Sequence, residues 1–172
     1  ENQKGYQNLI YLVSQGFTHG FYYRPRIDYR LLKEHSEGLI AMSACLSGDI
    51  PKLLLDGRDS VARAMAQRYL DIFGKNNFFI ELQDHGLPEQ QEINRGLMRL
   101  SAETGIPLVA TNDAHYLRRE DSEMHDVLLC IQTGKTLDDE NRMRMETEEM
   151  YDGQLLADVH SFPTTYFLDS EG

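Results

Sequence analysis

The stretch IPLVATNDAH, residues 106–115, decides the fold. It begins as a short apolar run and ends in polar residues that include Asp113 and His115. An apolar run of this length, placed after Gly105 at the end of a helical pattern, is typical of a buried strand in a parallel sheet. The stretch therefore predicts a βα unit in which a carboxylate and an imidazole follow the end of the strand.

Two earlier stretches have the same organisation. Residues 38–45 read as a short apolar strand that ends at Cys45, and residues 78–82 read as a strand followed by Asp84 and His85. Helical patterns are expected at residues 6–17, 28–35, 50–55, 59–73, 88–104 and 122–132. Asp28 can cap the second of these helices, and Asp59 or Ser60 can cap the fourth. The last helix has an apolar side made of Val127, Leu128, Leu129 and Ile131. Strand and helix alternate three times, so the sequence predicts an α/β fold with a parallel sheet.

The composition restricts the classes of function. The 172 residues are 41% hydrophobic, which suits one domain with a packed core. The net charge of −11 argues against a chain that holds a nucleic-acid backbone by itself, and it fits a cation-binding site. The two cysteines, Cys45 and Cys130, exclude a disulfide scaffold and favour a reducing cytoplasm. Because the first residue is Glu1, we expect a piece of a longer protein.

Candidate metal ligands follow three predicted strands. They are Cys45 after the first strand, Asp84 and His85 after the second (with Glu81 inside it), and Asp113 and His115 after the third. The carboxyl ends of parallel strands meet at one edge of a sheet, where sites commonly form. A carboxylate beside an imidazole suits zinc or manganese, and a thiolate favours zinc.

Each candidate also has a purely structural interpretation. Cys45 could be a small buried hydrophobic residue, Asp113 could cap a turn, and His85 could be a turn residue between Asp84 and Gly86. What favours a site is that three consecutive βα units bring such residues to the same end of one sheet.

The sequence does not decide the role of several other residues. Cys130 lies in an apolar run and is expected in the core. His125 beside Asp126 could be a surface pair, a core histidine or a support for a metal ligand. The segments 22–26 and 142–144 could contact phosphate, although solvated charge explains both.

Several long strings together resemble the PHP (polymerase and histidinol phosphatase) domain. The subtype is that of the alpha subunit of bacterial replicative DNA polymerase III. The strings are GFYYRPRID at 20–28, EGLIA at 37–41, ACLSG at 44–48, ELQDHG at 81–86, VATNDAHY at 109–116 and HDVLLCIQTG at 125–134. The resemblance covers about residues 1–151.

The resemblance implies a distorted (β/α)7 barrel with a metal cluster at the strand carboxyl ends. Cys45, Asp113 and His115 fall on ligand positions of the family, and His85 lies in a family motif. Members that keep their zinc or manganese ligands are associated with 3′–5′ exonuclease proofreading, in which metals activate water. Other members keep a silent PHP region that braces the polymerase and docks a separate exonuclease. The implied partners are DNA, a proofreading exonuclease and the sliding clamp, with no membrane.

Two departures from the family matter. Its N-terminal His-x-His motif is absent, so we expect a partial barrel that lacks its N-terminal strands and an incomplete metal cluster. Residues 1–151 would be the partial PHP domain and 152–172 a divergent or foreign tail. This tail looks like the cis-proline strand and hairpin of thioredoxin-like proteins, with Pro163 as the proline, yet the chain has no Cys-x-x-Cys. We expect DNA-directed DNA polymerase activity only in the intact parent, and none in this piece.

Overall fold

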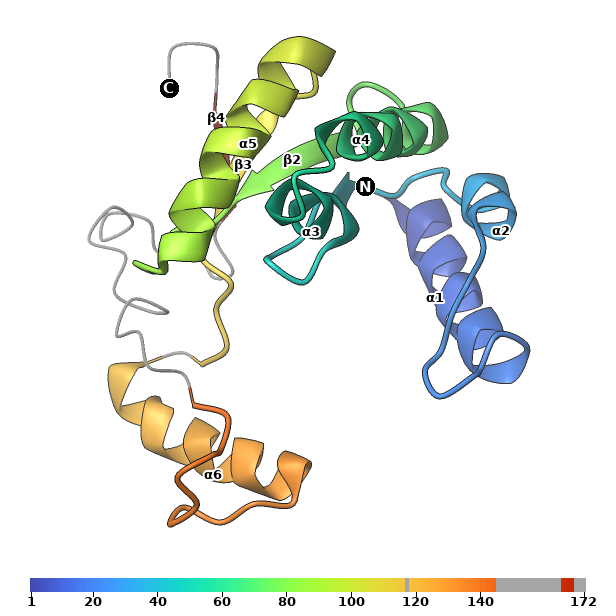
Figure 1. The fold of residues 1–172 in the computed structure, drawn as a ribbon. Helices are drawn as coiled ribbons and strands as arrows, with labels where there is room; N and C mark the ends of the chain where they lie inside the picture. The colour runs from blue at the N-terminus through green and yellow to red at the C-terminus, as the bar shows by residue number, and fades with distance from the viewer. Residues whose placement is uncertain (117, 145–164, 169–172) are drawn as a thin grey trace.

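The computed structural model describes residues 1–116, 118–144 and 165–168 (Figure 1). The helices are α1 (Gln3–Thr18), α2 (Tyr29–Glu34), α3 (Asp49–Leu55), α4 (Asp59–Phe73), α5 (Pro88–Thr104) and α6 (Ser122–Thr133), with a 3-10 turn η1 (Arg119–Asp121) before α6. The strands are β1 (Ala41–Met42), β2 (Phe78–Leu82), β3 (Leu108–Thr111) and β4 (Thr165–Leu168). Among these helices, none has the length and apolar character needed to cross a membrane.

The strands form one sheet in the order β1-β2-β3-β4. β1 pairs with β2 and β2 with β3 in parallel, whereas β4 runs antiparallel to β3. The predicted α/β organisation with a parallel sheet is confirmed for β1 to β3. β4 lies within the predicted tail, where a strand was expected; Pro163 and the expected hairpin turn lie outside the described residues.

The hydrophobic core lies between the sheet and helices α3, α4 and α5 (Figure 1). Phe78 and Ile80 project from the same face of β2 because side chains alternate along a strand, and both are buried. They pack with side chains from the three helices and from the start of the third βα unit: Ile50, Ala62, Ala66, Ile93, Leu97, Leu100 and Ile106. Burial of each large apolar side chain contributes about 1.5–3 kcal/mol, so this cluster holds the three βα units together.

Most helices begin and end close to the residues that the sequence predicts. The carboxylate of Asp28 caps α2 by accepting a hydrogen bond from the amide of Leu31 at 2.8 Å, as predicted. Gly105 ends α5 with φ of +69°, a conformation that glycine adopts without strain. The predicted cap of α4 by Asp59 or Ser60 is wrong. α4 already includes both residues, and Asp59 stands in the first turn, where its charge favours the helix dipole instead.

β1 is much shorter than the strand predicted over residues 38–45. Gly38 has φ of +74° and Ala44 has φ of +64°, and neither conformation can continue a strand. Only Ala41 and Met42 therefore pair with β2. The left-handed turn at Ala44 starts the loop that carries Cys45.

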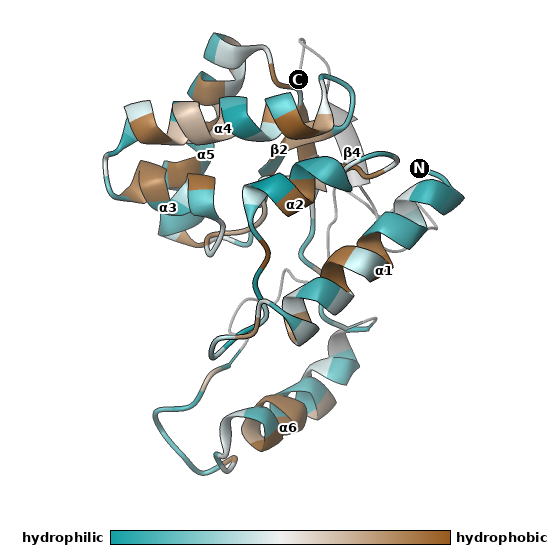
Figure 2. Ribbon diagram, turned by 90° about the vertical axis from the view of Figure 1, so that its right-hand side faces the viewer, coloured by the Kyte–Doolittle hydropathy of each residue, from teal (hydrophilic) through white to brown (hydrophobic). Residues whose placement is uncertain are grey.

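Helices α1 and α6 extend away from this core (Figures 1 and 2). Both helices have exposed apolar side chains. On α6 the structure buries Leu129 and Cys130 as expected, but Leu128 is 60% exposed and Ile131 72% exposed. Of the predicted apolar side, which comprises Val127, Leu128, Leu129 and Ile131, only Leu129 is buried by the described residues. On α1 the apolar residues whose spacing of three and four predicted the helix are also exposed: Tyr6, Leu9, Ile10, Val13 and Phe17.

Candidate functional site

The carboxyl ends of β1, β2 and β3 define one edge of the sheet, because the three strands are parallel. The segments that follow them are residues 43–45, 83–85 and 112–115. The sequence prediction that the candidate residues lie beyond neighbouring strand ends is therefore confirmed at the level of the backbone. The side chains decide which of them come together.

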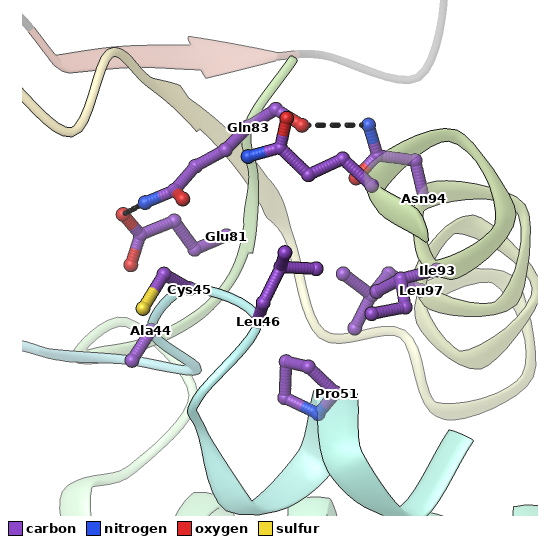
Figure 3. A pocket seen from close by; sticks show the side chains of 10 residues that line it. Ala44, Cys45, Leu46, Pro51, Glu81, Gln83, Ile93, Asn94 and Leu97 are labelled. Atoms are coloured by element: carbon purple, nitrogen blue, oxygen red, sulfur yellow. Dashed lines mark hydrogen bonds between the residues drawn. The ribbon is translucent and has the colours of Figure 1, made fainter. Parts of the chain in front are cut away.

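Cys45 is half-buried and reduced at this edge. It lines a small pocket together with Glu81 and Gln83 of the β2 end, and Leu46 and Asn94 lie on other sides of it (Figure 3). The thiol of Cys45, which follows β1, and the carboxylate of Glu81 in β2 therefore line the same pocket.

A polar network that the sequence did not reveal joins the three strand ends. The amide of Gln83 donates a hydrogen bond to Glu81 Oε1 at 3.0 Å, and the hydroxyl of Thr111 on β3 donates to the same oxygen. The backbone amide of Glu81 donates to Ser43 Oγ at 2.9 Å. Gln83 Oε1 is buried and has no hydrogen-bond partner among the described residues. The available signal was the pair Glu81 and Gln83, whose spacing of two puts both side chains on one face of an extended chain.

His85 is buried, at 2% exposure, and both of its ring nitrogens are engaged within the protein. Nδ1 lies 2.9 Å from the side-chain amide nitrogen of Gln90, and Nε2 lies 3.0 Å from the carbonyl oxygen of Asn112. An amide nitrogen can only donate, so we assign the proton to Nε2, which donates it to Asn112. No ring lone pair is then left for a metal, and this geometry favours a positioning role for His85.

Asp113 and His115 stand just beyond β3. Asp113 is half-buried with φ of +41°, an uncommon conformation that an aspartate tolerates better than most residues. His115 is exposed, and its Nδ1 lies 2.6 Å from the carbonyl oxygen of Asp113. The ring of His125 on α6 lies 5.5 Å from that of His115, centroid to centroid. His125 therefore packs beside His115, while its neighbour Asp126 pairs with Arg142. A supporting role of His125 for a metal ligand stays a prediction.

The predicted ligands do not assemble into one metal site in this arrangement. Within residues 1–116 and 118–144, no group of three or more His, Cys, Asp or Glu side chains is placed to hold an ion. Cys45 adjoins Glu81, whereas His115 lies against His125. The donor types suit zinc or manganese, but the described part of the chain does not by itself fit such an ion.

Arg142, the first residue of the predicted basic motif at 142–144, is committed to internal contacts. Its side chain is 8% exposed and forms an ion pair with Asp126 of α6. Its Nε also donates to the carbonyl oxygen of Leu137 at 3.1 Å. Arg142 therefore connects the segment after α6 to that helix, and its Nε and one of its terminal nitrogens already have partners within the protein.

Comparison with known families gives a match over the first part of the chain. Residues 1–85 match the PHP domain. The chain therefore contains PHP-domain sequence, which confirms the resemblance drawn from its motifs.

Relatives that match over most of the chain are more specific. It is 48% identical over 151 residues to a protein named DNA polymerase III subunit alpha from Treponema pallidum, and 88% of the chain is covered. Proteins of the same name from Deinococcus radiodurans and Thermus aquaticus are 51% and 49% identical, and each covers 86% of the chain. The chain spans 13%, 11% and 12% of the length of these three relatives, respectively.

Proposed function

We propose that this chain is a region of a bacterial DNA polymerase III alpha subunit, a DNA-directed DNA polymerase that acts in replication in the cytoplasm. This proposal is supported by the relatives named DNA polymerase III subunit alpha, to which about half of the residues are identical over 86–88% of the chain. Nucleotide addition would belong to the complete subunit, because the chain spans 11–13% of these relatives. The chain alone would be inactive.

Within that subunit, the PHP region would form part of a (β/α)7 barrel with a divalent-metal site associated with 3′–5′ exonuclease proofreading. The observation that carries this proposal is the parallel pairing of β1, β2 and β3, which brings Cys45, Asp113 and His115 to one edge of the sheet. Other parts of the subunit would complete the ligand set for zinc or manganese. His85 would hold Asn112, and with it the start of the Asp113–His115 segment.

A second function has specific support. The described ligands do not gather around one ion, and both ring nitrogens of His85 are used internally. A silent PHP region that braces the polymerase and docks a separate proofreading exonuclease would have these properties. In either case the partners would be DNA and replisome subunits such as that exonuclease and the sliding clamp.

The replacement His115→Ala in the complete subunit distinguishes the two functions. We expect loss of zinc- or manganese-dependent 3′–5′ digestion of a primer while primer extension continues, because His115 is exposed at the strand edge and outside the packed core. His19→Ala, at the exposed end of α1, is the control and should change neither activity. Persistent metal-dependent digestion in His115→Ala, or equal loss of both activities, contradicts the metal function and favours the brace.

A further inference from the structure

The loop after α1 exposes three consecutive aromatic rings. Phe21, Tyr22 and Tyr23 are 58%, 62% and 84% exposed. Phe21 stacks against Phe17 of α1 with ring centroids 6.5 Å apart, and Tyr22 and Tyr23 meet edge to face at 4.6 Å. Tyr23 has φ of +60°, an unfavourable conformation for a bulky residue. Strained positions of this kind concentrate at binding sites.

The same loop is basic, in contrast to the chain as a whole. Residues 21–26 contain two arginines and no acidic residue, whereas the chain carries a net charge of −11. Arg24 and Arg26 are exposed, and the guanidinium of Arg26 lies 4.8 Å above the centre of the Tyr22 ring. Within the described residues neither arginine forms a salt bridge, so both remain available to an anionic ligand.

Close approach of this loop to the end of α1 gives it a fixed shape. A Cβ atom on Gly20 would lie 1.9 Å from the carbonyl oxygen of Arg26, so only glycine admits the chain there. At Gly16 a Cβ would be 3.5 Å from the Cβ of Pro25, whose ring restricts the backbone further. The amide of Tyr22 donates to the carbonyl oxygen of Arg24 at 3.1 Å and closes the turn. The rings are therefore displayed on a preformed support.

We propose that residues 21–26, the aromatic–basic loop, bind single-stranded DNA. Exposed ring faces stack on unpaired bases, and neighbouring arginines contact the phosphates, which is the combination used by single-strand-binding surfaces. A duplex keeps its base faces stacked inside and offers phosphates and groove edges, but no free base face, to such a loop. The inference rests on the proposed function only in the choice of DNA, and it requires no metal.

The test measures the fluorescence anisotropy of a labelled oligothymidine strand titrated with the 172-residue chain at low salt. Tyr23→Gly removes the most exposed ring and suits the positive φ, so the loop should keep its shape. We expect affinity to fall about tenfold, the loss typical of one stacked base. Tyr6→Ala, which removes an exposed ring at the other end of α1, is the matched control and should not change affinity.

A second pair of variants tests the phosphate contacts. Arg26→Gln should weaken binding and reduce the slope of log K against log salt by about 0.7, the value for one phosphate contact to a single strand. Arg95→Gln, an exposed arginine on α5, should leave the slope unchanged. Circular dichroism of each variant establishes that it retains the helices of the unmodified chain.

Three results overturn the proposal: no binding of the strand by the folded chain, equal affinity of Tyr23→Gly and Tyr6→Ala, or binding of a duplex as tight as binding of the single strand. In the complete subunit, a strand containing iodouracil should cross-link to Tyr22 or Tyr23, and absence of this cross-link also overturns it. Primer extension by the same subunit is measured in a separate assay. A subunit that does not extend primers would contradict the proposed polymerase function, and this result would be independent of whether the loop binds single-stranded DNA.

Discussion

His85 links two strand ends through one buried side chain. It accepts from the Gln90 amide at Nδ1 and donates to Asn112 from Nε2, so β2, α5 and β3 meet at a single ring. From the sequence, His85 was either a turn residue or a metal ligand, and neither interpretation included Gln90. The partner could not be predicted because it depends on how the first turn of α5 lies over the turn at residues 84–86.

Removal of this ring should destabilise the fold. For His85→Ala we expect a loss of about 2–4 kcal/mol in the free energy of unfolding, because the Asn112 carbonyl and the Gln90 amide lose their partner and a cavity forms. Urea denaturation followed by circular dichroism measures this loss. His19→Ala, at the exposed C-terminal end of α1, is the control and should cost less than about 0.5 kcal/mol. Equal stability of the two variants would show that His85 is not structural.

At the scale of elements, the sequence predicted helices more reliably than their first residues. The apolar periodicity located α1 to α6 because it depends on the local spacing of side chains. The cap at Asp28 was also predicted, but at α4 two residues with capping side chains, Asp59 and Ser60, lie inside the helix. Strand β1 was shortened by left-handed backbone at Gly38 and Ala44, which an apolar run does not reveal.

The two candidate caps give a direct comparison. Asp28→Ala should lower the free energy of unfolding by about 1 kcal/mol, since it removes the acceptor of the Leu31 amide. Ser60→Ala should have almost no effect, or stabilise α4 slightly, because alanine is the better helix former inside a helix. Urea midpoints of the two variants provide the measurement. A larger loss for Ser60→Ala would contradict the observed start of α4.

At the scale of the whole molecule, α1 and α6 have exposed apolar faces. These faces are consistent with the fact that the chain spans only a small part of the length of its relatives. Leu128 and Ile131 on α6, and Phe17 on α1, are side chains that a complete subunit could cover. The sequence predicted which strand ends lie together, since that follows from parallel pairing. It did not predict that Cys45 adjoins Glu81 while His115 lies against His125, because the directions of side chains at strand ends depend on the loops.

The isolated chain should accordingly be inactive as an enzyme. We expect no digestion of fluorescent single-stranded DNA with added zinc or manganese, no nucleotide addition, and no disulfide exchange in an insulin-reduction assay. Digestion should be absent because no group of three candidate ligands is assembled within the described residues. Disulfide exchange should be absent because the chain has no Cys-x-x-Cys, and nucleotide addition is expected only of the complete subunit. Binding of the strand without cleavage is compatible with this expectation. Digestion that disappears in Asp113→Ala would contradict it.

The central claim is that the carboxyl ends of β1 to β3 form the edge of the sheet that binds metal in a larger subunit. The most direct test of this claim is the metal content of the complete subunit. Elemental analysis combined with anomalous scattering should show zinc or manganese within bonding distance of His115. The ion should be lost in Asp113→Ala and retained in Asp56→Ala, which removes an exposed carboxylate at the end of α3 that is not among the candidate ligands. A complete subunit without metal at His115, or one whose metal is unaffected by Asp113→Ala, would contradict the claim.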